Sequence, residues 1–203
     1  SGGIEFTSDI INEDFETLLD KTITLGGKNC FFRSNNEVIN LAGVMGGKST
    51  ACNKDTKSVL IECAYFKPES IIGIAQKYNL HSDASYKFER GVNPDIQEKT
   101  LRRFINIVSE HTTIKDIKFT NFPSKELPPK KIKFDHERIQ NILGTEIREA
   151  AYKDSITKIG FEVENDEVIV PSFRHDITHQ NDLAEEMARI IGWTVPGSIF
   201  NFG

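Results

Sequence analysis

The chain has 203 residues, of which 38% are hydrophobic and 27% are charged, and its formal net charge at pH 7 is -5. A chain of this length can form one large domain or two small ones, and we favour two. The negative net charge argues against an autonomous module that binds a nucleic-acid backbone by charge alone, although a local basic patch could touch RNA.

Cysteine content and hydropathy narrow the class of protein further. Cys30, Cys52 and Cys63 are too few for a disulfide framework and lack the paired spacing of a zinc site. No apolar run approaches the roughly 20 residues that cross a bilayer, and no charged-apolar-small leader opens the chain. We therefore expect a soluble, cytoplasmic protein with reduced thiols. Ser1-Gly2-Gly3 is typical of a cloning remnant, which predicts a segment of a longer protein.

The N-terminal part predicts a short helix followed by an antiparallel meander. Apolar and polar residues follow no clear period in the first residues, and only a short helix near Glu13 to Leu19 is predicted there. Thr22 to Leu25 and Lys28 to Phe32 flank Gly26-Gly27, which is the signal of a tight hairpin turn. A second turn at Ser34-Asn35-Asn36 leads into a third strand, Val38 to Ala42.

Two stretches after this meander carry candidate site residues. Gly43 to Gly47 contains adjacent glycines, which either form a bulge or turn or allow close approach of a ligand. Ser58 to Cys63, SVLIEC, is a short apolar run that predicts a buried strand with the carboxylate of Glu62 inside it. A charged residue in a buried strand must be paired, protonated or facing a cavity, so Glu62 lies either at a rim or in a site.

His81 to Pro94, HSDASYKFERGVNP, has six ionisable side chains and neither a helical nor a strand period. This pattern predicts a binding loop between two packed helices. The segment KPESIIGIAQKYNL predicts the first helix, with a buried stripe formed by Ile71, Ile72, Ala75 and Tyr78. Pro94 to His111 predicts the second, capped by Asn93, with inward-facing Ile96, Phe104, Ile107 and Val108.

A polar, proline-rich stretch from Lys115 to Pro129 marks the predicted domain boundary, after a strand that ends at Phe122-Pro123. It separates a first domain, residues 1–124, from a second, residues 125–203. We expect an α+β fold in both, with a mixed or antiparallel sheet and packed helices in the first domain and a small winged-helix-like arrangement in the second.

The second domain carries clear local signals. Its predicted elements, in order, are a strand at Lys131 to Phe134, a helix capped by Asp135 that runs to Leu143 and ends at Gly144, a helix at Ala150 to Ile159 with a turn at Gly160, a hairpin of Phe161 to Val163 with Val168 to Val170, and a final helix in THQNDLAEEMARIIGW. The acidic start of the final helix has the wrong sign for entering a DNA groove.

Acidic residues gather at this final helix. Asp182, Glu185 and Glu186 stand at i, i+3 and i+4, which places them on one exposed face, and Asp176 lies just ahead of the helix. The opposite, buried stripe is predicted to be Leu183, Met187, Ile190 and Ile191. The acids either complement the helix dipole or hold a magnesium ion through their oxygen atoms.

Several blocks of the chain, in this order, resemble a known family. LAGVMGGKST, VLIECAYFKPESI and LHSDASYKFERGVNP look like the editing domain in the beta subunit of bacterial phenylalanine-tRNA ligases, and PSFRHDI with DLAEEMARIIGW looks like the block that closes the following domain. The resemblance implies hydrolysis of tyrosine wrongly joined to the phenylalanine tRNA. It implies that Glu62 recognises the para-hydroxyl of tyrosine and that Gly46 and Ala84 shape the pocket, with Ser82 where the family commonly has threonine. Backbone N–H groups of the glycine turn and the Ser82 hydroxyl are suitable donors to an oxyanion.

The resemblance also implies partners. Asp176, Asp182, Glu185 and Glu186 match family residues that coordinate a magnesium ion shared with the alpha subunit, in an alpha2beta2 heterotetramer that binds tRNA(Phe) and, through the alpha subunit, ATP and phenylalanine. Neither DNA nor a membrane is an expected partner. Because a histidine-bearing segment of the family's pocket lies upstream of this chain, we expect the chain alone to be a poor hydrolase. The alternative is a non-catalytic structural module for subunit interaction.

Overall fold

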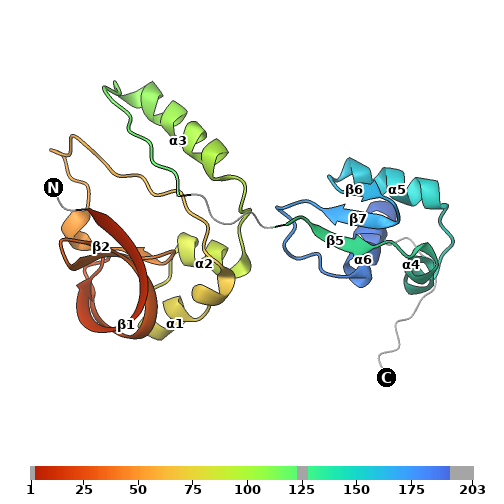
Figure 1. Cartoon of the computed structure of the whole chain (residues 1–203), viewed down its shortest axis with the longest axis horizontal. Helices are drawn as coiled ribbons and strands as arrows, with labels where there is room; N and C mark the ends of the chain where they lie inside the picture. Colours follow the sequence, from red (N-terminus) through yellow and green to blue (C-terminus); the bar gives the residue numbers. More distant parts are fainter. Residues whose placement is uncertain (1–2, 123–127, 193–203) are drawn as a thin grey trace. The chain divides into compact units, whose positions relative to one another are not determined.

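The computed structural model describes residues 3–122 and 128–192, and the chain divides into two compact units, residues 1–113 and 114–203 (Figure 1). Both units combine antiparallel strands with helices, which confirms the predicted α+β class. Lys115 to Phe122 form no strand, contrary to prediction, and the predicted boundary at residue 124 falls outside the described residues. None of the helices described is long and apolar enough to cross a membrane.

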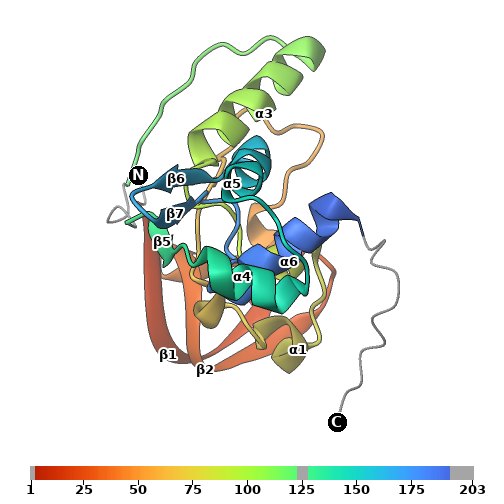
Figure 2. The same cartoon turned by 90° about the vertical axis from the view of Figure 1, so that its right-hand side faces the viewer.

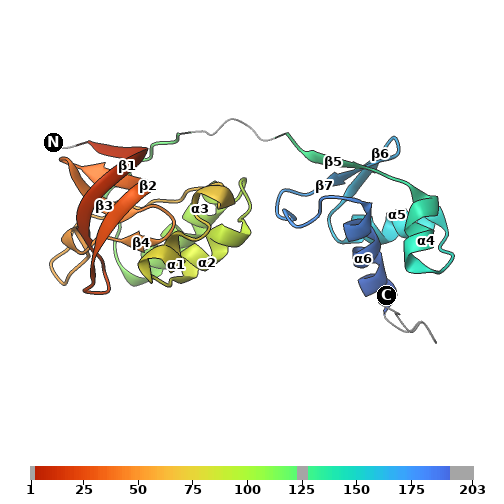
Figure 3. The same cartoon turned by 90° about the horizontal axis from the view of Figure 1, so that it is seen from below.

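The first unit begins with two long paired strands, β1 (Ile4–Glu16) and β2 (Thr22–Ser34), which curve together in Figure 3. The predicted helix near Glu13 to Leu19 is wrong, because β1 pairs with β2 in one continuous register as far as Glu16↔Thr22. The predicted turn at Gly26-Gly27 is also wrong: both glycines lie inside the ladder, opposite Asn12 and Ile11.

Two side chains, one from β2 itself and one from α1, form hydrogen bonds to this glycine pair. The buried Asn29 donates from Nδ2 to the Gly27 carbonyl at 2.9 Å, and the Tyr78 hydroxyl accepts from the Gly26 N–H at 3.0 Å. The Gly26-Gly27 signal therefore marks a positive φ, 75° at Gly27, within a strand that these contacts hold in the sheet.

The sheet continues with β3 (Glu37–Leu41) and β4 (Met45–Gly46), in the order β1-β2-β3-β4. The turn at Asn35-Asn36 is confirmed, since both asparagines have positive φ, and β3 confirms the predicted third strand. A short 3-10 helix, η1 (Lys48–Thr50), follows β4. Ser58 to Cys63 are not the predicted buried strand: no strand pairs with them in the described part of the chain, and Leu60 is 72% exposed.

The helices of the first unit are η2 (Pro68–Ser70), α1 (Ile74–Tyr78), α2 (Asp83–Arg90) and α3 (Gln97–His111). Gly73, with φ 80°, breaks the predicted helix before α1 and leaves Ile72 exposed. The predicted loop of His81 to Pro94 contains α2, because Ser82 and Ser85 form a capping box that starts a helix there.

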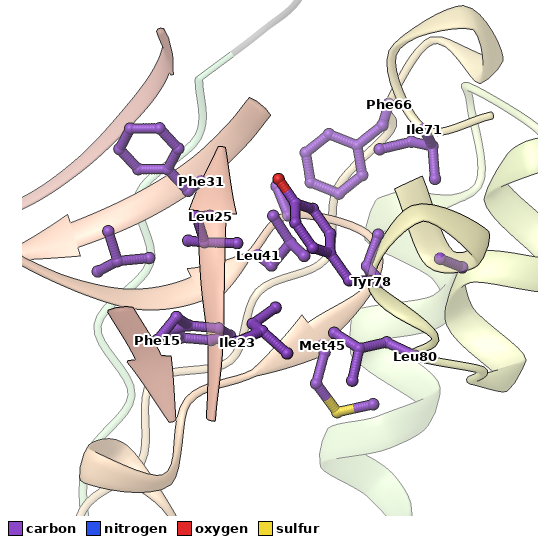
Figure 4. Close-up of a cluster of buried hydrophobic side chains, with 14 residues drawn as sticks. Phe15, Ile23, Leu25, Phe31, Leu41, Met45, Phe66, Ile71, Tyr78 and Leu80 are labelled. Carbon is purple, nitrogen blue, oxygen red and sulfur yellow. The ribbon is translucent and has the colours of Figure 1, made fainter. Parts of the chain in front are cut away.

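The core of this unit lies between the sheet and α1 (Figure 4). Ile71, Tyr78 and Leu80 face Leu25 and Leu41 of the strands. Burial of such side chains stabilises the unit by roughly 1.5–3 kcal/mol each. Helix α3 contributes no buried residue: its predicted inward stripe is wrong at Ile96, Phe104 and Ile107, each at least 40% exposed, and Ile96 rather than Asn93 is the capping residue.

The second unit matches the predicted order of elements, which are β5 (Lys130–Lys133), α4 (His136–Leu143), α5 (Glu149–Lys158), β6 (Glu162–Glu164), β7 (Glu167–Val170) and α6 (Gln180–Ile191). The strands pair in the order β5-β7-β6, and α4 packs on α6 (Figure 2). The Asp135 carboxylate accepts from the Arg138 N–H at 3.0 Å, and Gly144 ends α4 with φ 64°, as predicted.

The core of the second unit forms around Tyr152, Phe161 and Leu183. The Tyr152 hydroxyl donates to the Leu183 carbonyl at 3.3 Å, so that α5 is tied to α6. Leu183 and Met187 are buried as predicted. The last turn of α6 differs, because Ile190 and Ile191 are 42% and 43% exposed.

Candidate functional site

An open pocket of about 390 Å³ lies in the first unit, where the turn between β3 and β4, residues 62–64, α2 and the start of α3 meet. Three of the four predicted pocket residues, Gly46, Glu62 and Ala84, line it from separate segments. Apolar side chains such as Val44 and Phe88 form much of the remaining wall. The pocket thus combines an apolar wall with one carboxylate, a composition typical of small-molecule sites.

Glu62 is the acidic group of this pocket. Glu62 as a whole residue is exposed, but the pocket walls partly desolvate its carboxylate, and this desolvation raises its pKa. Glu62 Oε2 accepts a hydrogen bond from Asn40 Nδ2 at 3.3 Å. No lysine, arginine or histidine of the described residues forms an ion pair with it. The carboxylate is therefore available to a hydrogen-bond donor from outside the chain.

Ser82 lies beside the pocket without lining it. Its hydroxyl donates to the Val44 carbonyl at 2.6 Å and accepts from the Ser85 N–H at 3.1 Å. These bonds start α2 and tie it to the turn between β3 and β4, which positions Ala84. Because the hydroxyl proton is already donated, Ser82 is not free to stabilise an oxyanion in this arrangement.

The glycines between β3 and β4 differ in what they do. Gly47 donates to the Ile39 carbonyl at 2.8 Å, and a Cβ there would lie 2.7 Å from that same oxygen. Gly43 has φ 70° and packs against Phe66 and Ile71. Backbone geometry therefore explains Gly43 and Gly47, which supports the turn interpretation for both. Gly46 contributes to the pocket wall.

Sequence reasoning missed several lining residues. Asn40, from β3, contacts Glu62, while Gln97 and Thr100 come from the first turn of α3. Cys63 donates from Sγ to the Gln97 carbonyl at 3.3 Å, and burial together with the charge of Glu62 raises the pKa of this thiol. A polar residue inside the otherwise apolar strand Val38 to Leu41 was a signal that could have identified Asn40.

The predicted metal ligands of the second unit are arranged around an arginine. Arg174 donates to both carboxylate oxygens of Asp176, at 2.9 and 2.7 Å, and from Nη1 to Glu186 Oε2 at 2.9 Å. Arg189 donates to the other oxygen of Glu186. Glu186 is only 7% exposed, contrary to the expected exposed position, and its hydrogen bond with Arg174 lowers its pKa.

The other two acids point to different partners. The Asp182 carboxylate accepts from the N–H groups of Thr178 and His179, at 2.6 and 3.0 Å. Desolvation by itself would raise the pKa of Asp182. These hydrogen bonds outweigh desolvation, so the pKa is lowered overall. Glu185 is exposed, 3.9 Å from Arg189. Within residues 3–122 and 128–192, no three histidine, cysteine or acidic side chains are grouped to hold a metal. This arrangement does not fit magnesium ligation, and the magnesium site stays a prediction.

Comparisons with known proteins agree with the two-unit organisation. The B3/4 domain family matches residues 1–113, and the tRNA synthetase B5 domain family matches residues 132–193. The beta subunit of phenylalanine-tRNA ligase from Nitrosococcus oceani is 35% identical over 184 residues, covering 87% of this chain and 23% of that protein. The corresponding subunit from Methylococcus capsulatus is 32% identical over 199 residues, covering 95% of this chain and 25% of that protein.

A solved N-terminal fragment of the phenylalanyl-tRNA synthetase beta subunit from Pyrococcus horikoshii is similar at a TM-score of 0.41 and 14% identity, over 91% of this chain and 55% of that one. This chain spans about a quarter of the length of the curated relatives named above. The matches confirm the family that the sequence blocks predict. The chain belongs to the B3/4 domain family and, with the B5 domain that follows, corresponds to part of a bacterial phenylalanine-tRNA ligase beta subunit.

Proposed function

We propose that this chain contributes to hydrolytic editing of tyrosyl-tRNA(Phe) within the phenylalanine-tRNA ligase beta subunit. The observation that carries the proposal is the Glu62 carboxylate, which lines one pocket with Gly46 and Ala84 and forms no ion pair with a described residue. Had Glu62 been paired with a lysine or arginine, a purely structural role would have been favoured.

The chemistry of the pocket suits selection for a hydroxyl group. A bound tyrosine would donate its phenolic O–H to the Glu62 carboxylate, whereas phenylalanine would leave one oxygen of this partly desolvated carboxylate without a donor. A site built to bind a hydroxyl group rejects the analogue that lacks it far better than an apolar pocket rejects an added hydroxyl. A second pocket of this kind can therefore select tyrosyl-tRNA over phenylalanyl-tRNA after the amino acid has been joined to the tRNA.

The role assigned to Glu62 is recognition of the substrate. Attack on the ester requires a positioned water and stabilisation of the oxyanion. The Ser82 hydroxyl and the Gly47 N–H are already engaged with the Val44 and Ile39 carbonyls, so neither is proposed as an oxyanion donor. The proposal thus assigns substrate selection, and not bond cleavage, to the residues described.

Deacylation of tyrosyl-tRNA(Phe) by the assembled ligase tests this proposal. Glu62→Ala is expected to slow deacylation by about 10- to 100-fold, the effect of a lost hydrogen bond to a charged group. Charging with phenylalanine should not change. Glu69→Ala, which removes an exposed glutamate outside the pocket, is the matched control. An unchanged deacylation rate in Glu62→Ala would refute the editing role.

The same proposal includes the partners that the family resemblance implies: an alpha subunit in an alpha2beta2 heterotetramer, tRNA(Phe), and ATP bound on the alpha subunit, in the cytoplasm. The relatives are named as beta subunits, and this naming supports an enzyme with more than one kind of subunit. We propose no DNA or membrane partner.

A second candidate is a module that serves subunit interaction alone. The exposed apolar side chains of α3, Phe104 and Ile107, favour it, because such side chains are common at interfaces. The Glu62→Ala measurement separates the two candidates, since an interaction module requires no carboxylate in a pocket.

A further inference from the structure

Asn40 faces the pocket from β3, next to an irregularity in that strand. Phe32 pairs with Asn40 and Arg33 pairs with Val38, so one residue of β3, Ile39, has no partner of its own and forms a bulge. In a regular strand, Val38 and Asn40 would share a face. Asn40 follows the regular register beside the buried Leu41, at 1% exposure, so it faces away from this core. The bulge at Ile39 brings Val38, at 6% exposure, back to the core side.

The residue paired with Asn40 in the next strand has no side chain. Asn40 pairs with Gly46 across the ladder between β3 and β4, and both residues line the pocket. Gly46 has no side chain, so nothing from the paired strand covers the Asn40 amide. The amide reaches Glu62 instead, with Nδ2 3.3 Å from Oε2.

The contact with Asn40 restricts the side chain of Glu62, which belongs to an irregular segment. Glu62 lies outside any helix or strand, and its side chain would otherwise be free to rotate. A donor on one oxygen restricts that rotation and leaves the other oxygen, Oε1, available to a ligand. A preorganised acceptor costs less conformational entropy when the ligand binds.

We propose that Asn40 is a positioning residue that holds Glu62 in the orientation that accepts a ligand hydroxyl group. The inference rests on the proposed function, in which that hydroxyl belongs to tyrosine. It assigns part of the selectivity for hydroxyl-bearing substrates to the Asn40 amide.

A purely structural role for Asn40 would predict a lower melting temperature when its side chain is truncated. Asn40 is only partly buried, and the contact with Glu62 is its one side-chain hydrogen bond among the described residues. Truncation of Asn40 should therefore leave the melting temperature of the enzyme unchanged while impairing the selection for tyrosine.

The test compares deacylation of tyrosyl-tRNA(Phe) and of phenylalanyl-tRNA(Phe) by the assembled ligase carrying Asn40→Ala or Asn40→Asp. Either variant is expected to lower kcat/KM for the tyrosyl substrate about tenfold, since each removes the donor, and to spare the phenylalanyl substrate. Asn40→Asp keeps the shape of the side chain. Asn12→Ala, at an exposed position of β1 in the same sheet, is the matched control.

A double-variant comparison separates this inference from the editing proposal. In the Glu62→Ala background, Asn40→Ala should have no further effect, because its target is gone. Equal losses in both backgrounds, or full activity of Asn40→Asp, would overturn the positioning role. If Glu62→Ala impairs editing and Asn40→Ala does not, only this inference fails. If Glu62→Ala itself has no effect, the editing proposal fails and the inference with it.

Discussion

Two glutamates of this chain, Glu62 and Glu186, occupy opposite electrostatic environments. Desolvation raises the pKa of Glu62, whose hydrogen-bond partner among the described residues is the neutral amide of Asn40. Hydrogen bonding to Arg174 lowers the pKa of Glu186, which also contacts Arg189. Glu186 is thus satisfied within its own unit, whereas Glu62 keeps an acceptor for a ligand. The two carboxylates therefore differ in their partners, and not in burial alone.

The largest effect on stability is expected from Glu186→Gln. Glu186 is 7% exposed, and its loss of charge leaves the guanidinium of Arg174, which is also largely buried, with Asp176 alone. We expect the free energy of unfolding of the second unit to fall by about 3 kcal/mol, the low end of the range for breaking a buried pair. Hydrogen exchange of the α6 amides measures this for the second unit separately.

Glu185→Gln is the matched control on the same helix. Its carboxylate is exposed and 3.9 Å from Arg189, so the change should stay within about 0.5 kcal/mol. Equal effects of the two substitutions would show that the burial of Glu186 and its contacts with Arg174 do not stabilise the unit. The contrast drawn between Glu186 and Glu62 would then be wrong.

A smaller effect is expected at the glycine pair that ends β4, beside the pocket. Gly47→Ala would place a Cβ 2.7 Å from the Ile39 carbonyl oxygen, which is backbone and cannot move without disturbing the sheet. We expect a loss of about 1–3 kcal/mol for the first unit, as for other overpacked sites. In Gly46→Ala the clash is with Cδ1 of Leu18, a half-exposed side chain that can rotate away. Chemical denaturation of the two variants should rank Gly47→Ala clearly below Gly46→Ala.

The smallest effect, of opposite sign, is expected from Glu62→Gln. Because the pKa of Glu62 is raised in the folded state, its ionised form disfavours folding slightly near neutral pH. Removal of the charge should leave the first unit equally stable or more stable by less than about 0.5 kcal/mol. This difference should disappear below about pH 4, where the glutamate is protonated in both folded and unfolded chains. Denaturation curves at pH 4 and pH 7 give the comparison, and a destabilising Glu62→Gln would mean that Glu62 is structural.

Short-range signals in the sequence determined most of the second unit. The Asp135 cap, the Gly144 helix end and the turn at Asn165-Asp166 each involve residues a few positions apart, and all are present in the structure. Such features depend on local backbone geometry and local hydrogen bonds, which neighbouring residues specify. The motif blocks also brought Gly46, Glu62 and Ala84 to attention as pocket residues.

Tertiary structure decided the first unit and the environment of every site residue. The register of β1 with β2 overrode the local signals at Glu13 to Leu19 and at Gly26-Gly27, because a long ladder satisfies more backbone hydrogen bonds than a short helix or a tight turn. Asn40 faces Glu62 because the sheet turns it to the side opposite the buried Leu41, and Glu186 is neutralised only because Arg174 folds against α6. Contacts between residues distant in sequence set these charges and orientations, and no local pattern encodes them.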